Sequence, residues 1–176
     1  MHRLTAGDPA PTFRKNDYLG AEVSLPTAGT GNVFLSFYRY ASCPMCNLRT
    51  RELILAIERF DAANISMIAV WQSPAAEISK QMETHKPPFP VIADPAFELY
   101  RAYGVESSVF GLLKAARRTG DVISAIHKGF FPGKVDGPIH RIPADFLIGS
   151  DGKIIDAYYG NDAGDHMPLE RVFSKL

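Results

Sequence analysis

The fold is most clearly predicted by one stretch of the 176-residue sequence, Val33-Phe34-Leu35-Ser36-Phe37-Tyr38-Arg39-Tyr40-Ala41-Ser42-Cys43-Pro44-Met45-Cys46. Its first six residues are an apolar run that predicts a buried strand. A helix is expected from Pro44, because proline is favoured at the first helical position, where its missing N–H would be unpaired in any case. The two cysteines of the chain therefore lie between a strand and the start of a helix.

The residues that follow extend this pattern. Apolar side chains at helical spacing predict one helix over residues 44–63. Residues 65–71 form a second apolar run, typical of a buried strand. Strand, helix and strand predict a βαβ unit with two parallel strands and a right-handed crossover. The apolar residues expected to form the buried face of the helix are Leu48, Leu53, Ile54, Ile57 and Phe60.

The other expected elements make the chain an α/β protein with a central mixed sheet flanked by helices. Residues 1–32 are expected to be an extended, turn-rich lead-in segment. Further helices are expected at 74–85, 94–103, 107–127 and 168–174, and further strands at 89–93, 145–148 and 153–159. The helix at 107–127 has an apolar face of Val109, Leu112, Leu113 and Ala116. Nothing divides the sequence, so residues 1–176 are expected to form a single domain.

Composition excludes several classes of function. Lys plus Arg equals Asp plus Glu at 19 each, so no excess charge attracts nucleic acid or an anionic membrane. The sequence has no apolar run long enough to span a bilayer and no secretory signal at its start. Two cysteines are too few for a disulfide scaffold and fit a reducing cytoplasm. Prior removal of a signal peptide stays open as an alternative.

The spacing of the two cysteines predicts redox chemistry. Free N–H groups and the helix dipole at a helix start stabilise a thiolate. Residues i and i+3 lie close enough for a disulfide, and so small a ring is labile rather than stabilising. A zinc site would need two more ligands, and the five histidines form no spaced pair. A zinc site and a pair of inert buried cysteines stay as the less favoured alternatives.

Four motifs then occur in the order found in a known family: Gly7-Asp8-Pro9-Ala10-Pro11, the active-site region 37–44, the segment 89–105, and Pro143 to Ile148 with Asp151-Gly152-Lys153-Ile154. With these motifs the chain resembles the thioredoxin-fold peroxiredoxin-like family, the alkyl hydroperoxide reductase/thiol-specific antioxidant group. The resemblance implies a thioredoxin-like fold, an N-terminal hairpin and a thiol-based antioxidant oxidoreductase without a cofactor or metal.

The active-site motif departs from that of the family. Cys46 takes the place of the peroxidatic cysteine, Cys43 replaces the threonine that orients the peroxide, and Arg39 replaces a proline. Pro143 takes the place of the family's arginine and resembles the cis-proline of thioredoxins. The resemblance therefore implies two modes. As a disulfide reductase, Cys43 attacks and Cys46 resolves; as a peroxidase, Cys46 attacks and Cys43 resolves.

Other residues are expected to support the pair. Arg39 and Arg141 are candidates to lower a thiolate pKa or to hold an anion, with surface charges as the alternative. Tyr40 belongs to the active-site loop, and Trp71 is expected to pack at the end of its strand. Residues 128–143 are either one wall of a substrate groove or simply a long connection.

The expected partners follow from the resemblance. They are a peroxide or disulfide substrate and a thiol reductant such as a thioredoxin-type protein, with a homodimer as a further expectation. The alternative function is a non-enzymatic module that senses redox state or binds a metal through the same cysteine pair.

Overall fold

The structure is a computed structural model that describes residues 2–25, 31–107 and 119–175. Within these ranges, five strands form one sheet in the order β5–β4–β3–β6–β7. β3 and β4 are parallel, as are β4 and β5, whereas β6 and β7 run antiparallel to their neighbours. The predicted βαβ unit and mixed sheet are thus confirmed. The strands are β3 (Asn32–Phe37), β4 (Ile65–Trp71), β5 (Val91–Ala93), β6 (Ala144–Ile148) and β7 (Ile154–Tyr159).

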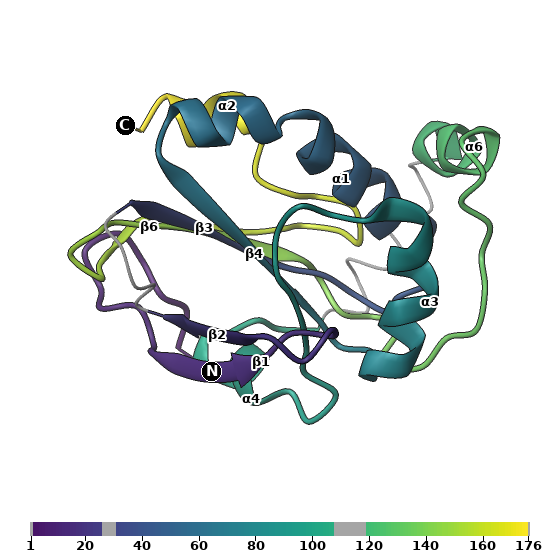
Figure 1. Ribbon diagram of the computed structural model, residues 1–176, viewed down its shortest axis with the longest axis horizontal. Coiled ribbons are helices and arrows are strands. Elements are labelled where there is room, and N and C mark those ends of the chain that lie inside the picture. The colour runs from purple at the N-terminus through teal and green to yellow at the C-terminus, as the bar shows by residue number, and fades with distance from the viewer. Residues whose placement is uncertain (1, 26–30, 108–118, 176) are drawn as a thin grey trace.

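Figure 1 shows helices above the sheet and a smaller layer below it. The upper layer contains α1 (Pro44–Leu55), α2 (Ile57–Ala62) and α7 (Leu169–Phe173). α3 (Ala75–His85) lies at the right-hand end of the strands, and its buried residues Ile78 and Met82 belong to the same core as α1. The lower layer contains α4 (Glu98–Ala102) and the expected N-terminal hairpin of β1 (Phe13–Asn16) and β2 (Glu22–Leu25). α6 (Thr119–His127) lies to one side, beyond the start of α1.

Each face of the sheet has its own hydrophobic core, because successive side chains of a strand point to opposite faces. Phe34 of β3 belongs to the core under α1 and α2, whereas its neighbours Val33 and Leu35 belong to the core over the hairpin and α4. Cys43 and Cys46 are part of the first of these cores. The candidate active site therefore lies on the face that α1 covers.

The single helix expected over residues 44–63 is wrong, because the chain forms two helices separated at Ala56. The backbone of Ala56 leaves the helical region, with φ −96° and ψ 3°. After this break, Phe60 of α2 packs against Phe34 and Phe173, with ring centroids 5.5 and 5.0 Å apart. An apolar pattern that continues through a bend does not reveal the bend, since both helices bury residues on the same core.

The buried face of α1 is also more polar than its apolar spacing predicts. Leu53 is buried, but Leu48 and Ile54 are only half-buried. Asn47, Arg49 and Thr50 are buried instead. Each of these three side chains donates a hydrogen bond to a backbone carbonyl, which gives it a polar partner away from water.

The remaining elements match the expected ones with shifted ends. α4 begins at Glu98 rather than directly after Asp94, whose carboxylate accepts the N–H groups of Glu98 and Leu99 at 3.0 and 2.8 Å. Of the helix expected over residues 107–127, α6 confirms the last part, and the apolar face at residues 109–116 lies outside the described residues. Among the helices that the structure describes, none is both long and apolar enough to cross a membrane.

Candidate active site

Cys43 and Cys46 lie at the start of α1, directly after the loop that follows β3. Cys43 is the N-cap residue, with an extended backbone at φ −70° and ψ 118°, and its carbonyl accepts the N–H of Asn47 at 3.0 Å. Cys46 lies in the first turn. Both thiols are free, and each cysteine is 1% exposed. The strand and helix thus hold two reduced, buried sulfurs close together.

The surroundings of Cys43 favour its thiolate. Burial raises its pKa, but the thiol of Cys46, the guanidinium of Arg39 and the backbone N–H groups of the first helical turn outweigh burial and lower the pKa to about 7. Nη1 of Arg39 lies 3.5 Å from Sγ of Cys43. A thiolate at a helix N-terminus beside a cation is the arrangement expected of a reactive cysteine.

Cys46 has the opposite character. Burial, the hydrogen bond to Cys43 and the negative charge on Cys43 all raise the pKa of Cys46 well above its ordinary value. The Cys46 thiol therefore keeps its proton and donates it towards the Cys43 sulfur. The pKa values of the two cysteines of one motif are thus shifted in opposite directions.

Arg39 and Tyr40 join Cys43 in one group. Arg39 is 4% exposed, and its guanidinium lies 5.1 Å from the centre of the Tyr40 ring. The Tyr40 carbonyl accepts the N–H of Cys43 at 3.0 Å. The structure therefore brings together four of the predicted site residues, Arg39, Tyr40, Cys43 and Cys46.

Asn47 fixes the turn that carries Cys43, and sequence reasoning missed it. Its side-chain amide donates to the carbonyls of Ala41 and Cys43 at 2.8 and 2.9 Å. Its Oδ1 is therefore an acceptor, and Nε2 of His85 donates to it at 2.8 Å. Burial, together with the charge of Arg51, lowers the pKa of His85 to about 4, so this imidazole is neutral. The signal available in the sequence was an asparagine directly after the Cys-Pro-Met-Cys motif, at a helix position that is buried in the structure.

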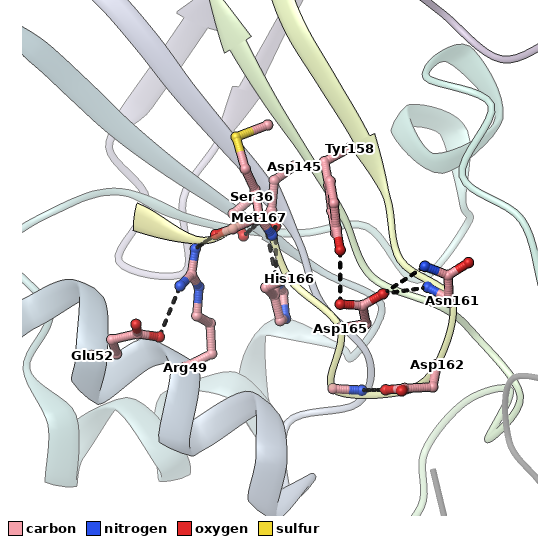
Figure 2. A network of polar contacts seen from close by, with 11 residues as sticks. Ser36, Arg49, Glu52, Asp145, Tyr158, Asn161, Asp162, Asp165, His166 and Met167 are labelled. Atoms are coloured by element: carbon pink, nitrogen blue, oxygen red, sulfur yellow. Dashed lines mark hydrogen bonds and ion pairs between the residues drawn. The ribbon is translucent and has the colours of Figure 1, made fainter. Parts of the chain in front are cut away.

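A buried polar network anchors α1 to the sheet beneath the cysteines (Figure 2). The carboxylate of Asp145 on β6 accepts the Ser36 hydroxyl at 2.5 Å, the Met167 N–H at 2.6 Å and Nδ1 of His166 at 3.1 Å. Arg49 of α1 donates to the Met167 carbonyl and to Glu52, both at 2.8 Å. Burial opposes ionisation of Asp145, but His166, Arg49 and Ser36 together lower its pKa. The helix that carries Cys46 is thereby held from both β6 and the C-terminal segment.

Residues 128–141 lie against the loop that carries Cys43. Three side chains of the protein body donate to this segment: Ser42 to the Lys134 carbonyl at 2.7 Å, Gln72 to the Pro138 carbonyl at 3.2 Å and Ser73 to Asp136 at 2.6 Å. Arg39 donates through its other terminal nitrogen to the Ile139 carbonyl. At the start of the segment, the Phe130 ring stacks on His85, with centroids 4.9 Å apart. These contacts place the segment beside the sulfurs, as the groove hypothesis requires.

Three predicted supporting residues do not contact the cysteines in the described interactions. Arg141 donates to the Val105 carbonyl at 2.9 Å and lies over the rings of Phe97 and Tyr100. Trp71 is fully buried and stacks on Tyr38, with centroids 4.7 Å apart, which is a packing role.

Pro143 is the third of these residues. It is buried directly before Ala144, the β6 residue that pairs with Phe37 of β3. Its carbonyl accepts the N–H of Gly160 at 3.0 Å.

This sheet order, with a thiolate–thiol pair at the start of the helix after β3, defines a thiol-based oxidoreductase with a thioredoxin-like fold. The model of the AhpC/TSA family matches residues 6–157, and the chain belongs to that family. Peroxiredoxin Bcp of Escherichia coli K12 is 27% identical over 154 residues, which cover 88% of this chain and 85% of that protein.

Solved structures agree on the fold. Peroxidoxin BcpB of Mycobacterium tuberculosis has a TM-score of 0.71 at 18% identity, covering 99% of this chain and 96% of that one. A cysteine-to-serine mutant of peroxiredoxin Q of Xanthomonas campestris has a TM-score of 0.65 at 15% identity, covering 89% of this chain and 88% of that one. The thioredoxin-like fold and the peroxiredoxin-like class predicted from sequence are confirmed.

Proposed function

We propose that Cys43 is the attacking thiolate and Cys46 the resolving thiol of a dithiol–disulfide oxidoreductase. The observation that carries this proposal is the division of the pair. Cys43, with Arg39 beside it, has its pKa lowered to about 7, whereas the pKa of Cys46 is raised. Because the thiolate is the nucleophile, the cysteine that ionises first attacks first.

With a disulfide substrate, the Cys43 thiolate attacks one sulfur, the substrate S–S bond breaks, and the other sulfur leaves as a thiolate. Cys46 then attacks the Cys43 sulfur of the mixed disulfide. The second substrate sulfur leaves with the proton of Cys46, and the Cys43–Cys46 disulfide remains. The substrate gains two electrons and the cysteine pair loses two.

Peroxide is the second candidate substrate, and the peroxiredoxin relatives favour it. The Cys43 thiolate attacks one oxygen, the O–O bond breaks, and the other oxygen takes up a proton and leaves as water or an alcohol. The sulfenic acid on Cys43 condenses with the Cys46 thiol to give the disulfide and water. In this proposal Cys43 attacks in both reactions, although Cys46 holds the peroxidatic position of the family motif.

The finer expectations also stay proposals. The oxidised pair is returned to the dithiol by a thioredoxin-type thiol reductant, and the protein works in the cytoplasm, the compartment that fits a chain with only two cysteines. Residues 1–176 act as one thioredoxin-like domain, and a homodimer is the proposed assembly.

The test is rapid mixing of the reduced protein with hydrogen peroxide, an organic hydroperoxide and a small disulfide, beside Cys43→Ser and Cys46→Ser variants. We expect Cys43→Ser to react with none of them. Cys46→Ser should react once and stop at the sulfenic acid or the mixed disulfide, which mass spectrometry identifies. A reactive Cys43→Ser beside an inert Cys46→Ser would reverse the assignment. One equivalent of zinc in protein purified without chelator would instead favour the metal-binding alternative.

A further inference from the structure

The segment of residues 128–141 is attached to the body of the protein mainly through side chains. No backbone–backbone hydrogen bond joins residues 131–137 to the other residues that the structure describes. Residues 131–135 are exposed, and Phe131, Val135 and Ile139 present apolar side chains to solvent. A segment with few buried apolar contacts opens at a lower free energy than the core.

The sulfurs beside this segment are closed off. Cys43 and Cys46 are each 1% exposed, so neither presents its sulfur to a large substrate in this conformation. The residues that hold the segment, Ser42 and Gln72, are themselves 8% and 1% exposed. Figure 1 shows the segment, in green, running from α6 along the side of the molecule that carries α3 and on to β6.

Two glycines show how closely the segment is seated. A Cβ at Gly133 would lie 2.9 Å from Cβ of Ser42, and one at Gly137 would lie 2.6 Å from Nε2 of Gln72. The segment backbone therefore rests directly on the two side chains that hydrogen-bond to it. At Gly137 the contact is the end of the flexible Gln72 side chain, whereas at Gly133 it is Cβ of Ser42, which has no freedom to turn away. An added methyl group at Gly133 would therefore force the segment and its contact apart.

We propose that residues 128–141 form a lid over the cysteine pair, and that Ser42 and Gln72 are specificity-determining residues because they hold it closed. The closed lid admits small reactants through slight movements, whereas a protein disulfide needs full opening. A larger substrate therefore needs a larger opening of the lid before it reaches Cys43. This inference takes from the proposed function only that Cys43 is the reactive thiol.

The experiment compares N-ethylmaleimide with a polyethylene-glycol maleimide, because both carry the same reactive group and differ in size. The full-length reduced protein is quenched at intervals, and mass spectrometry of peptides locates the modified cysteine. We expect wild-type Cys43 to prefer the small reagent more strongly than free cysteine does. Ser42→Ala and Gln72→Met should each raise the rate with the large reagent about fivefold, the effect of one lost hydrogen bond, and raise the rate with the small one less.

Gly133→Ala should act in the same direction, with Gly120→Ala as its matched control, because a Cβ at Gly120 meets no atom within 4 Å. Hydrogen exchange of the 128–141 peptide should quicken in the same variants, a change that a general loss of packing would spread over the core. The lid is ruled out if wild type and free cysteine show the same size preference, or if Gly133→Ala behaves as Gly120→Ala does. The comparison of two maleimides of different size does not depend on turnover of peroxide or disulfide. If the variants relax the size preference while the cysteines are inert to peroxide and disulfide, the proposed function is overturned and this inference is intact.

Discussion

Two regions beside the active site each contain an aspartate that accepts a hydrogen bond from a serine. One is the lid, and the other, here called the floor, is the buried network of Ser36, Asp145, His166 and Met167. Asp145, bonded to Ser36, is completely buried and also accepts hydrogen bonds from Met167 and His166. Asp136, bonded to Ser73, lies half-buried in the lid. The Ser–Asp hydrogen bond is therefore part of a buried anchor at Asp145, whereas at Asp136 it is a contact that breaks when the lid opens. The site combines a rigid base with a cover that moves independently.

The largest expected effect comes from breaking the floor. Asp145→Ala leaves His166, Ser36 and the Met167 N–H without their buried acceptor and removes a buried negative charge near Arg49, so the free energy of unfolding should fall by about 3–5 kcal/mol. Urea denaturation measures the change. The matched variant Asp136→Ala should cost only about 1 kcal/mol, since it removes one hydrogen bond, that of the buried Ser73 hydroxyl, and no buried charge. Equal losses of unfolding free energy in Asp145→Ala and Asp136→Ala would show that the floor and the lid contribute equally to stability.

The next effect concerns Arg39, which contacts Cys43 and, through the Ile139 carbonyl, the lid. Arg39→Met removes the cation that helps to lower the pKa of Cys43, so this pKa should rise towards the ordinary value of a thiol. The rate of Cys43 with N-ethylmaleimide at pH 7 should then fall about tenfold, and its dependence on pH should shift upward. Arg39→Lys, which keeps the charge, should recover part of the rate. An unchanged pH profile in Arg39→Met would remove Arg39 from this role.

The smallest expected effect is a pH dependence of the free energy of unfolding, which arises at a contact that links the lid to α1. His85 is the contact, bonded to Asn47 and stacked on Phe130. Its pKa is about 4 in the folded protein against an ordinary 6.5, so unfolding takes up a proton below pH 6.5. Stability should therefore fall as pH decreases from 6.5 to 4. The loss should be on the order of 1 kcal/mol, because the ring is partly solvated.

Denaturation curves across this range, with His85→Gln beside the wild type, measure the effect of the imidazole. The variant has no such group and should lack this part of the pH dependence. Identical profiles for the two proteins would exclude His85 as its source.

Local sequence patterns predicted most of the fold. The apolar runs of β3 and β4 and the cysteine pair at the start of α1 need only neighbouring residues to be recognised. The break at Ala56 was not predictable, because apolar spacing continues on both sides of it. The order of four motifs along the chain identified the family, because four distant motifs rarely match the order of a family by chance.

The candidate site was predictable only where it is local. Arg39, Tyr40, Cys43 and Cys46 are close in sequence and come together in the structure. The partners of Asp145 are not predictable in this way, because Ser36, His166 and Arg49 meet it only through strand pairing and the return of the C-terminal segment. Arg141 shows that nearness in sequence to a predicted site residue does not ensure a place at the site. A cation near Pro143 in sequence turns to the opposite face of the sheet, where it contacts Phe97 and Tyr100.

The anchor of Arg49 on the Met167 carbonyl has a consequence for how the protein is made. The ribosome releases Cys43 and Cys46 early, whereas Asp145, His166 and Met167 emerge much later. Until they do, α1 lacks its attachment to the C-terminal segment, and the two thiols lack the burial that the finished core gives them. A nascent chain therefore carries two ordinary, accessible cysteines, and oxidants or chaperones meet a different pair from the one in the finished protein.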